Sequence, residues 1–136
     1  MNLYIALDND GLRKKLKLAQ VLDNIEEIRR ISYDINKGNK IFISWAERCL
    51  GCMVEEQGTE LIIEVPADCL DELEALKEEY KSATGQMPNV GLGKKVSEAI
   101  KALKVSKLKN SNNKSIFYDR SVEEQLKETK LEKLRN

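Results

Sequence analysis

Two aspartates one residue apart, Asp8 and Asp10, follow an apolar run at residues 3–7. This run is β-rich in type and too short for a free-standing helix, so it predicts a buried central strand. Carboxylates at the carboxyl end of a buried strand are where α/β and α+β proteins commonly hold a divalent metal over a ligand crevice. Together with Asn9 and Gly11, the same acids are also typical of a simple turn. The stretch alone leaves both interpretations open.

Histidine is absent from the chain. Its absence excludes serine–histidine and cysteine–histidine catalysis, histidine-based zinc hydrolysis and histidine proton relays. Any bound metal would have oxygen ligands, which favours magnesium, manganese or calcium. Phosphoryl transfer is a reaction in which the metal and the positioning of groups matter more than an acid–base side chain. The sequence therefore favours phosphoryl transfer as its chemistry.

The composition is that of one domain. With 136 residues, the chain is long enough to bury a core of its own. Lysine plus arginine and aspartate plus glutamate both number 23, so the net charge is zero and gives no general attraction to nucleic acid or membrane. No run approaches about 18 apolar residues, and the first residues do not resemble a signal peptide. We expect a cytoplasmic protein with free cysteines, no membrane contact and no direct nucleic-acid partner.

Two helices are expected after the first strand. The first is short and begins after Gly11. The second has Asn24 as its N-cap, with Glu27 as the capping-box partner, and ends at Gly51. Gly38 lies inside the second helix and could weaken or kink it. An apolar stripe at steps of three, four and seven predicts its core-facing side: Ile25, Ile28, Ile31, Ile35, Phe42, Trp45 and Cys49.

Residues 52–55 and 59–65 are two strand-like runs separated by a turn that contains Gly58, so they predict a β-hairpin. Asp68 is the expected cap of the next helix, which Gly85 ends. A short strand at 89–92, a helix that begins at 96 and an edge strand at 115–118 are expected to follow. Glycines flank Leu92 and suggest close approach of the backbone to something.

This order of elements predicts an α+β fold, ferredoxin-like, with a central antiparallel sheet flanked by helices. The predicted domain covers residues 1–119. Residues 120–136 are strongly charged and predict a tail that is at best a weak amphipathic helix, either docked or frayed.

In such a topology the first strand lies beside the hairpin, so Asp8, Asp10 and Glu60 can converge at one rim of the sheet. These carboxylates would hold one or two magnesium ions, with a backbone carbonyl near Asn9 as an extra ligand. Two metals about 3.5–4 Å apart can activate a ribose hydroxyl and stabilise a leaving pyrophosphate. Two alternatives stay open: Glu60 as a solvent-facing strand residue, and Asp10 as the N-cap of the first helix.

Four motifs follow one another along the chain. Residues 4–11 are an apolar strand that ends in Asp-x-Asp, and residues 57–63 are a turn and strand that contain Gly58 and Glu60. Residues 84–93 include a glycine-bearing strand, and residues 97–107 are a helix that ends at Lys107. In this order they resemble the first metal motif, the Gly-Gly-Asp-Glu/Asp hairpin, the glycine-bearing strand and the helix with a lysine near the nucleotide phosphates in the GGDEF-like palm domains of nucleotide cyclases, in particular the minimal CRISPR polymerases. The resemblance covers about residues 1–119 and implies a palm domain.

The hairpin departs from the family pattern. Gln57 stands in place of the first glycine and Thr59 in place of the first acid, so only Gly58 and the last acid, Glu60, remain. The first glycine lets the hairpin approach the nucleotide, so Gln57 could narrow the site, and Thr59 removes one carboxylate. A milder divergence is Asn-Ser-Asn at residues 110–112, where the family has Gly-Arg/Lys-Asn.

The resemblance implies a nucleotidyltransferase that joins nucleoside triphosphates into a cyclic oligonucleotide, with a cyclic dinucleotide from ATP, rather than GTP, as the favoured product. It implies antiphage signalling through a separate effector. It also implies a homodimer, because cyclisation needs two nucleotides that face each other. The implied ligands of Mg²⁺ or Mn²⁺ are Asp8, Asn9, Asp10 and Glu60. The implied nucleotide-binding residues are Asn9, Gly11, Gly58, Thr59 and Lys107.

Two other functions stay open. A degenerate palm domain could bind a nucleotide or a partner as a sensor without turnover, and Gln57 and Thr59 support this alternative. A related palm that hydrolyses a purine triphosphate ring would share the metal site, although the sequence disfavours it.

Overall fold

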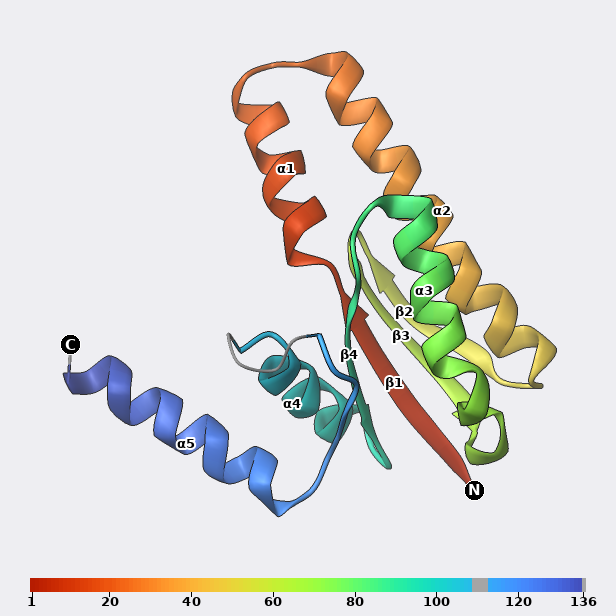
Figure 1. Ribbon diagram of the computed structural model, residues 1–136, viewed down its shortest axis with the longest axis vertical. Helices are drawn as coiled ribbons and strands as arrows, with labels where there is room; N and C mark the ends of the chain where they lie inside the picture. Colours follow the sequence, from red (N-terminus) through yellow and green to blue (C-terminus); the bar gives the residue numbers. More distant parts are fainter. Residues whose placement is uncertain (109–112, 136) are drawn as a thin grey trace.

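The computed structural model describes residues 1–108 and 113–135 of the chain. The divergence noted at residues 110–112 lies outside the described residues. Figure 1 shows the elements, which in chain order are β1 (Asn2–Asp8), α1 (Asp10–Val21), α2 (Ile25–Arg48), β2 (Cys52–Gln57), β3 (Glu60–Pro66), the 3₁₀ helix η1 (Ala67–Glu72), α3 (Leu73–Thr84), β4 (Asn89–Gly93), α4 (Val96–Ser106), β5 (Ile116–Phe117) and α5 (Arg120–Arg135).

The described strands form one open sheet with the order β2-β3-β1-β4-β5. β1 is central and antiparallel to both neighbours, with Leu7 opposite Leu61 on β3 and Asp8 opposite Asn89 on β4. Only β5, at one edge, is parallel to its neighbour. The predicted α+β, palm-like fold with a mostly antiparallel sheet is therefore confirmed, as are the hairpin and the edge strand.

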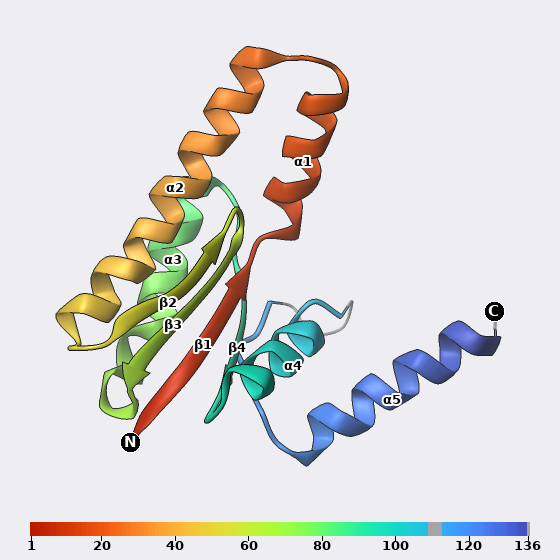
Figure 2. The same cartoon turned by 180° about the vertical axis from the view of Figure 1, so that it is seen from behind.

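Helices cover both faces of the sheet. α2 and α3 lie on one face and α4 on the other, as the two opposite views show (Figures 1 and 2). Side chains alternate along β1, so that Ile5 and Leu7 join the larger core, whereas Ala6 packs with Ala99 and Leu103 of α4. Trp45 is fully buried in the larger core, in agreement with its place in the predicted stripe.

α1 and the first half of α2 extend beyond the sheet as a helical arm (Figure 1). A small core of Leu12, Ala19, Ile31 and Ile35 holds the two helices together. Ile25, predicted to be core-facing, is 54% exposed because it lies near the free end of this arm. The arm does not cover the sheet, but it fixes the direction in which α1 leaves β1.

Gly38 does not interrupt α2, which is one continuous helix from Ile25 to Arg48. A Cβ atom at Gly38 would lie 2.6 Å from the Tyr80 ring and 2.8 Å from the Thr84 methyl group. The glycine therefore allows α2 and α3 to approach closely. Packing against α3 offsets the low helix propensity of glycine at this position.

The ends of the helices confirm some expected caps and correct others. Asn24 caps α2 by accepting a hydrogen bond from the Glu27 N–H at 3.2 Å, as predicted. The Glu27 side chain pairs with Arg30 instead of completing a capping box. Asp68 lies inside η1, and α3 begins at Leu73 without a side-chain cap, so the cap assigned to Asp68 is wrong. The reason is that a 3₁₀ turn precedes α3.

Glycines end two helices in different ways. Gly85 ends α3 in the left-handed region with φ +82°, as predicted. At the end of α2 it is Leu50 that has a positive φ, of 64°, before Gly51. Gly51 serves close packing instead, since a Cβ there would lie 2.0 Å from the Glu64 carbonyl oxygen.

The glycines that flank Leu92 allow α4 to approach β4. A Cβ atom at Gly91 would lie 2.1 Å from the backbone nitrogen of Leu103, and one at Gly93 would lie 2.8 Å from the nitrogen of Ala99. The close approach suggested by the sequence is therefore contact between a helix and a strand. It holds the end of α4 beside the end of β1, where Asp8 lies.

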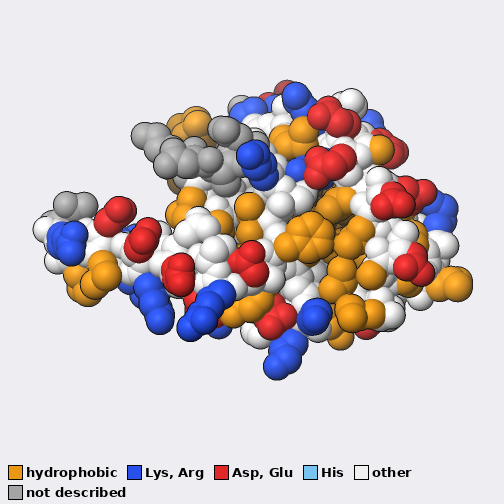
Figure 3. All heavy atoms as spheres, turned by 60° about the horizontal axis from the view of Figure 1, so that its bottom comes forward, with side chains coloured by type: hydrophobic (Ala, Val, Ile, Leu, Met, Phe, Trp, Pro, Cys, Tyr) orange, Lys and Arg blue, Asp and Glu red, His pale blue; other side chains and the backbone are white. Residues whose placement is uncertain are grey.

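α5 projects from the body, with acidic and basic side chains interspersed along it (Figure 3). Its first turn docks on the domain: Val122 is buried, and Glu123 accepts hydrogen bonds from Lys101 and the Tyr118 hydroxyl. The tail is therefore helical and attached at its beginning. None of the described helices is long and apolar enough to cross a membrane.

Candidate active site

Asp8 ends β1, and its carboxylate is fully buried. The Oδ1 atom accepts hydrogen bonds from the Asn9 backbone N–H at 2.7 Å and from the Thr59 hydroxyl at 2.6 Å. The Oδ2 atom accepts from Lys107 Nζ at 2.5 Å and from Arg13 Nη1 at 3.2 Å. A buried carboxylate is tolerated only when such contacts replace water, and here each oxygen has two of them.

The pKa of Asp8 results from opposing effects. Burial raises the pKa of this carboxyl, because desolvation disfavours the charged form. The hydrogen bonds from Lys107 and Thr59, together with the positive charge of Lys107, lower it by more. The pKa of Asp8 therefore lies below its ordinary value of 3.8, and the carboxylate is ionised at neutral pH.

Asp10 is the first residue of α1 and is half-buried. Its Oδ1 atom pairs with Arg13 Nη2 and lies 3.5 Å from Lys107 Nζ. Arg13 and Lys107 therefore each contact both Asp8 and Asp10. The structure brings the two predicted acids together, and two cations hold them there.

Asn9 fixes the path of the chain between the two acids. Its Oδ1 accepts a hydrogen bond from the Leu12 N–H at 3.1 Å, and its Nδ2 donates to the Tyr80 hydroxyl at 3.3 Å. Asn9 is thus the N-cap of α1, and the alternative that Asp10 caps this helix is wrong. The Asn9 carbonyl accepts from the Arg13 N–H at 3.1 Å, as in an ordinary first helical turn. Its role as a metal ligand stays a prediction.

The β2–β3 turn presents Thr59 to Asp8. Gly58 has φ +57°, a value that favours glycine, and its carbonyl accepts a hydrogen bond from Asn39 Nδ2 at 2.9 Å. The same amide donates to Glu56 at 2.9 Å, so α2 fixes the turn from behind. Thr59 is buried beneath the turn as a result.

Glu60 does not join the two aspartates. It begins β3 and is exposed, and no hydrogen bond or ion pair joins its side chain to the described residues. Within residues 1–108 and 113–135, no three acidic, cysteine or histidine side chains are arranged to hold a metal. Of the three carboxylates predicted to converge, the structure brings Asp8 and Asp10 together and leaves Glu60 outside. Lys107 contacts both aspartates, and Thr59 contacts Asp8.

A hollow of about 610 Å³ opens beside the acids. Asp10 and Gly11 line it from the first turn of α1, Lys107 from the end of α4, and Lys81 and Gln86 from the α3 side. This volume lies within the range of about 300–1,000 Å³ that is usual for small-molecule sites. The wall at Gly11 is tight, because a Cβ there would lie 1.7 Å from the Gln86 side-chain oxygen.

A family model for the minimal CRISPR polymerase domain, mCpol, matches residues 4–117. The chain belongs to this family. The match begins in β1 and ends in β5, so it includes both aspartates, the hairpin and Lys107. The family name indicates a CRISPR-related defence context and a polymerase-like role. No curated protein matched the chain.

Arg13 is the residue of this mCpol site that the sequence interpretation missed. Its guanidinium contacts both aspartates from one turn into α1. The available signal was the spacing of Asp10 and Arg13, because acid and arginine at i and i+3 on a helix lie side by side. The same spacing rule could not predict the contact between Arg13 and Asp8, because Asp8 precedes the helix.

The donor set fits a hard divalent cation. Asp8 and Asp10 offer carboxylate oxygens close enough to contact the same lysine nitrogen, at 2.5 and 3.5 Å. Mg²⁺ typically binds through one or two protein carboxylates, with phosphate oxygens and water completing its shell. Asp10 lines the hollow, whereas Asp8 lies behind it and reaches it through the contact with Lys107, so these two aspartates are the candidate ligands and Glu60 is not needed.

Proposed function

We propose that this minimal CRISPR polymerase domain is a metal-dependent nucleotidyltransferase that joins nucleoside triphosphates into a cyclic oligonucleotide. The favoured product is a cyclic dinucleotide made from ATP, which would carry an antiphage signal to a separate effector. The observation that supports this most is the buried Asp8 carboxylate, held with Asp10 beside a hollow of about 610 Å³.

Asp8 and Asp10 would hold Mg²⁺ or Mn²⁺. When bound, such an ion supplies a Lewis acid for the α-phosphate and for the attacking ribose hydroxyl. Asn9 and Glu60 stay predicted ligands. Asp8 is ionised at neutral pH, as a carboxylate ligand of a metal has to be.

Lys107 would neutralise the negative charge of the triphosphate. It lines the hollow and contacts both acids, so its ammonium lies where metal, carboxylates and phosphates would meet. Arg13 would position the two carboxylates through its two contacts. A rigid, pre-arranged set of charges is what phosphoryl transfer requires of a protein.

The beginning of α1 would bind phosphate oxygens. Asp10 and Gly11 are its first two residues and both line the hollow. Backbone N–H groups in the first helical turn have no partner within the helix, and the helix dipole favours an anion there. Gly58 and Thr59 stay predicted nucleotide-binding residues of the hairpin, and Thr59 contacts Asp8 behind the hollow.

A homodimer follows from the reaction. Each chain has one hollow beside the acids, and cyclisation joins two nucleotides, so two copies with opposed sites would supply both.

The alternative function is a sensor that binds nucleotide without turnover. The contact from Thr59 to Asp8 favours it, because a hydroxyl occupies an oxygen of the acid where the family pattern places a further carboxylate. Such a site would still bind a nucleotide and could lack the second metal that turnover needs.

Incubation of the purified protein with each nucleoside triphosphate and Mg²⁺ or Mn²⁺, followed by mass spectrometry, tests the proposal. We expect a cyclic dinucleotide mass from ATP that Asp8→Asn removes. Asp71→Asn is the matched control, because Asp71 is exposed on η1 and far along the chain from the site. Saturable nucleotide binding without product from any triphosphate would instead establish the sensor.

A further inference from the structure

A second hollow, of about 600 Å³, adjoins the first. The two share Lys81, Met87 and Asn113 as a common wall. The remaining lining comes from α3 and from the segment before β5, and it contains Lys77 and Lys114. No aspartate is among the described residues that line this second hollow, so the acid pair of the first hollow has no counterpart among them.

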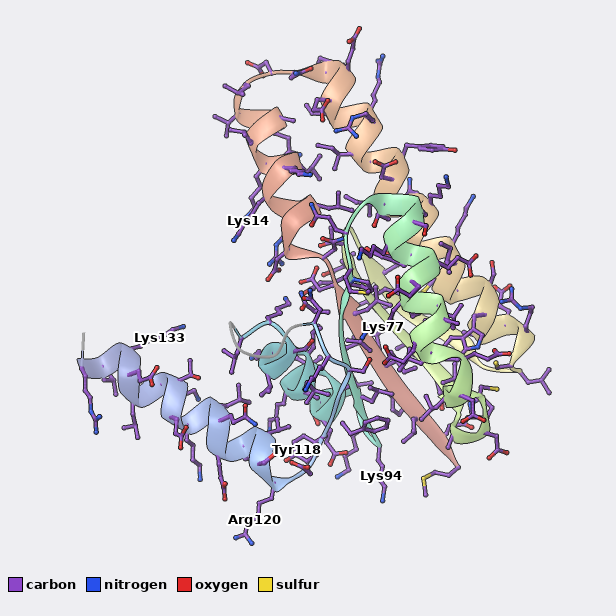
Figure 4. The ribbon with its side chains drawn as sticks, in the orientation of Figure 1. Lys14, Lys77, Lys94, Tyr118, Arg120 and Lys133 are labelled. Carbon is purple, nitrogen blue, oxygen red and sulfur yellow. The ribbon has the colours of Figure 1, made fainter. Side chains whose placement is uncertain are left out.

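Lys77 fixes one side of the second hollow. It lies between α3 and the sheet (Figure 4) and is only 3% exposed. Its Nζ donates hydrogen bonds to the Asn113 carbonyl at 2.9 Å and to the Ser115 hydroxyl at 3.0 Å. A lysine is seldom buried unless it is paired, and these contacts join α3 to the segment that leads into β5. The wall of the hollow is therefore held by a buried charged side chain.

The charges around the second hollow do not cancel. Glu74 is its one acidic residue among the described lining, and its carboxylate already contacts Lys77 at 3.5 Å and the Ser115 hydroxyl at 3.2 Å. Lys81 and Lys114 form no ion pair within the part of the chain that the structure describes. In the first hollow, by contrast, Lys107 is paired with Asp8 and Asp10. The second hollow has an excess of positive charge.

We propose that the second hollow is an oligophosphate subsite, which binds a diphosphate or triphosphate group without a metal. Several closely spaced negative charges and many acceptor oxygens match a set of lysine ammonium groups, which act as point charges for phosphate. Lys81 lines both hollows, so one phosphate chain can pass from the acids to this subsite. The inference rests on these charges and holds whether or not the acid pair supports turnover.

The phosphate group has two sources with the same chemistry. One is free diphosphate, the leaving group of the proposed reaction. The other is the phosphate chain of a bound nucleotide, which would extend from the first hollow past Lys81 into the second. Both require the cations of the second hollow, and both are independent of a metal at Asp8.

Isothermal titration of the full chain with inorganic diphosphate, in the presence of EDTA, tests the subsite. We expect saturable binding that Lys114→Glu weakens at least about tenfold, because the change reverses a charge at the wall of the hollow. The matched control is Lys104→Glu, an exposed lysine of α4 that lines neither hollow, and we expect it to bind as the wild type does. Unchanged melting temperatures would show that both variants are folded.

A second titration, in the presence of saturating ATP and again in EDTA, separates the two sources. If diphosphate still binds in the presence of ATP, the subsite takes free diphosphate. If ATP prevents diphosphate binding completely, and Lys114→Glu weakens the binding of both ligands equally, the subsite takes the phosphate chain of the nucleotide. Absence of saturable diphosphate binding to the wild type, or equal binding by the Lys114→Glu and Lys104→Glu variants, overturns the inference. Product formation by mass spectrometry is measured separately, so failure of the subsite leaves the proposed cyclase untouched.

Discussion

Two carboxylates in this protein have the same kinds of partner in different surroundings. Asp8 accepts hydrogen bonds from Lys107 at 2.5 Å and from the Thr59 hydroxyl at 2.6 Å, and it is buried. Glu123 accepts from Lys101 at 2.7 Å and from the Tyr118 hydroxyl at 2.8 Å, but its side chain is 35% exposed.

The two carboxylates differ in how strongly their contacts act, because one is exposed to water and the other is not. At the junction of α4 and α5, water competes for every group, so the contacts contribute little more than attachment of the tail. At the end of β1, water is excluded from Asp8, and charge interactions there are strong enough to bind and orient other charges. Burial, together with the contact to Lys107 at the hollow, distinguishes Asp8 from Glu123, although the two carboxylates have the same kinds of partner.

The largest expected difference in reaction rate is between variants of the two carboxylates. Asp8→Asn should lower product formation at least about a thousandfold, because it removes a charged metal ligand worth several kcal/mol of transition-state stabilisation. Glu123→Gln should leave the rate unchanged. Initial rates of diphosphate release measure both. Equal losses in the two variants would contradict the assignment of the site to the end of β1.

Variants of Lys107 and Lys101, the lysine partners of the two carboxylates, should show a smaller difference in reaction rate. Lys107→Gln should lower the rate about 100-fold, the usual effect of removing one pre-arranged donor to a developing charge. Lys101→Gln, the matched change at the tail, should stay within about twofold, since an exposed ion pair contributes little. The same assay compares them, and a wild-type rate for Lys107→Gln would remove Lys107 from the site.

Removal of the two hydroxyl donors, at Thr59 and Tyr118, should lower the free energy of unfolding by different amounts. Thr59→Val removes one of the hydrogen bonds that the buried Asp8 carboxylate accepts. This change should lower the free energy of unfolding by about 1–3 kcal/mol. Tyr118→Phe should have a smaller effect, because water can replace the lost hydroxyl at the exposed Glu123. Urea unfolding followed by the fluorescence of Trp45, the one tryptophan, reports on both. A larger loss for Tyr118→Phe would reverse the comparison.

The smallest expected effect is a pH dependence of tail docking. The hydrogen bond from Lys101, and then that from Tyr118, lower the pKa of Glu123 below its ordinary value of 4.5. A lowered pKa means that the contact stabilises the docked tail at pH above 4.5 and is lost as pH falls through the lower, folded-state value. The NMR shifts of the Tyr118 ring, whose hydroxyl donates to Glu123, should therefore move at acidic pH in the wild type and should lose this transition in Glu123→Gln. The shifts of Ser121 report Asp119 instead, because both its N–H and its hydroxyl donate to that carboxylate.

Local patterns in the sequence predicted much of the fold. The apolar run before Asp8, the helical stripe around Trp45 and the turn at Gly58 specify their elements through periodicity and turn chemistry over a few residues. The structure confirmed β1, α2 and the hairpin from such signals. It added a packing role for Gly38 that no local pattern displays, because the close contact with Tyr80 depends on how two helices meet.

The site was predicted less completely, because its contacts join distant parts of the chain. Asp8 and Asp10 were found from their position after a strand, and Lys107 only through the family resemblance. That Lys107 pairs with Asp8 depends on how α4 packs across β4, over 99 residues of sequence. The exposed position of Glu60 follows from the hairpin register and from the way Asn39 holds Gly58, neither of which a single sequence displays.

In the proposed reaction, Asp8 and Asp10 hold a metal together with a nucleotide. The most direct test is electron paramagnetic resonance of Mn²⁺ with the full chain and α,β-methylene ATP, a nucleotide that cannot release diphosphate. We expect saturable Mn²⁺ binding that the nucleotide strengthens and that Asp8→Asn weakens at least about tenfold, with Glu123→Gln equal to the wild type. Equal Mn²⁺ binding by the wild type and Asp8→Asn in the presence of nucleotide would contradict it.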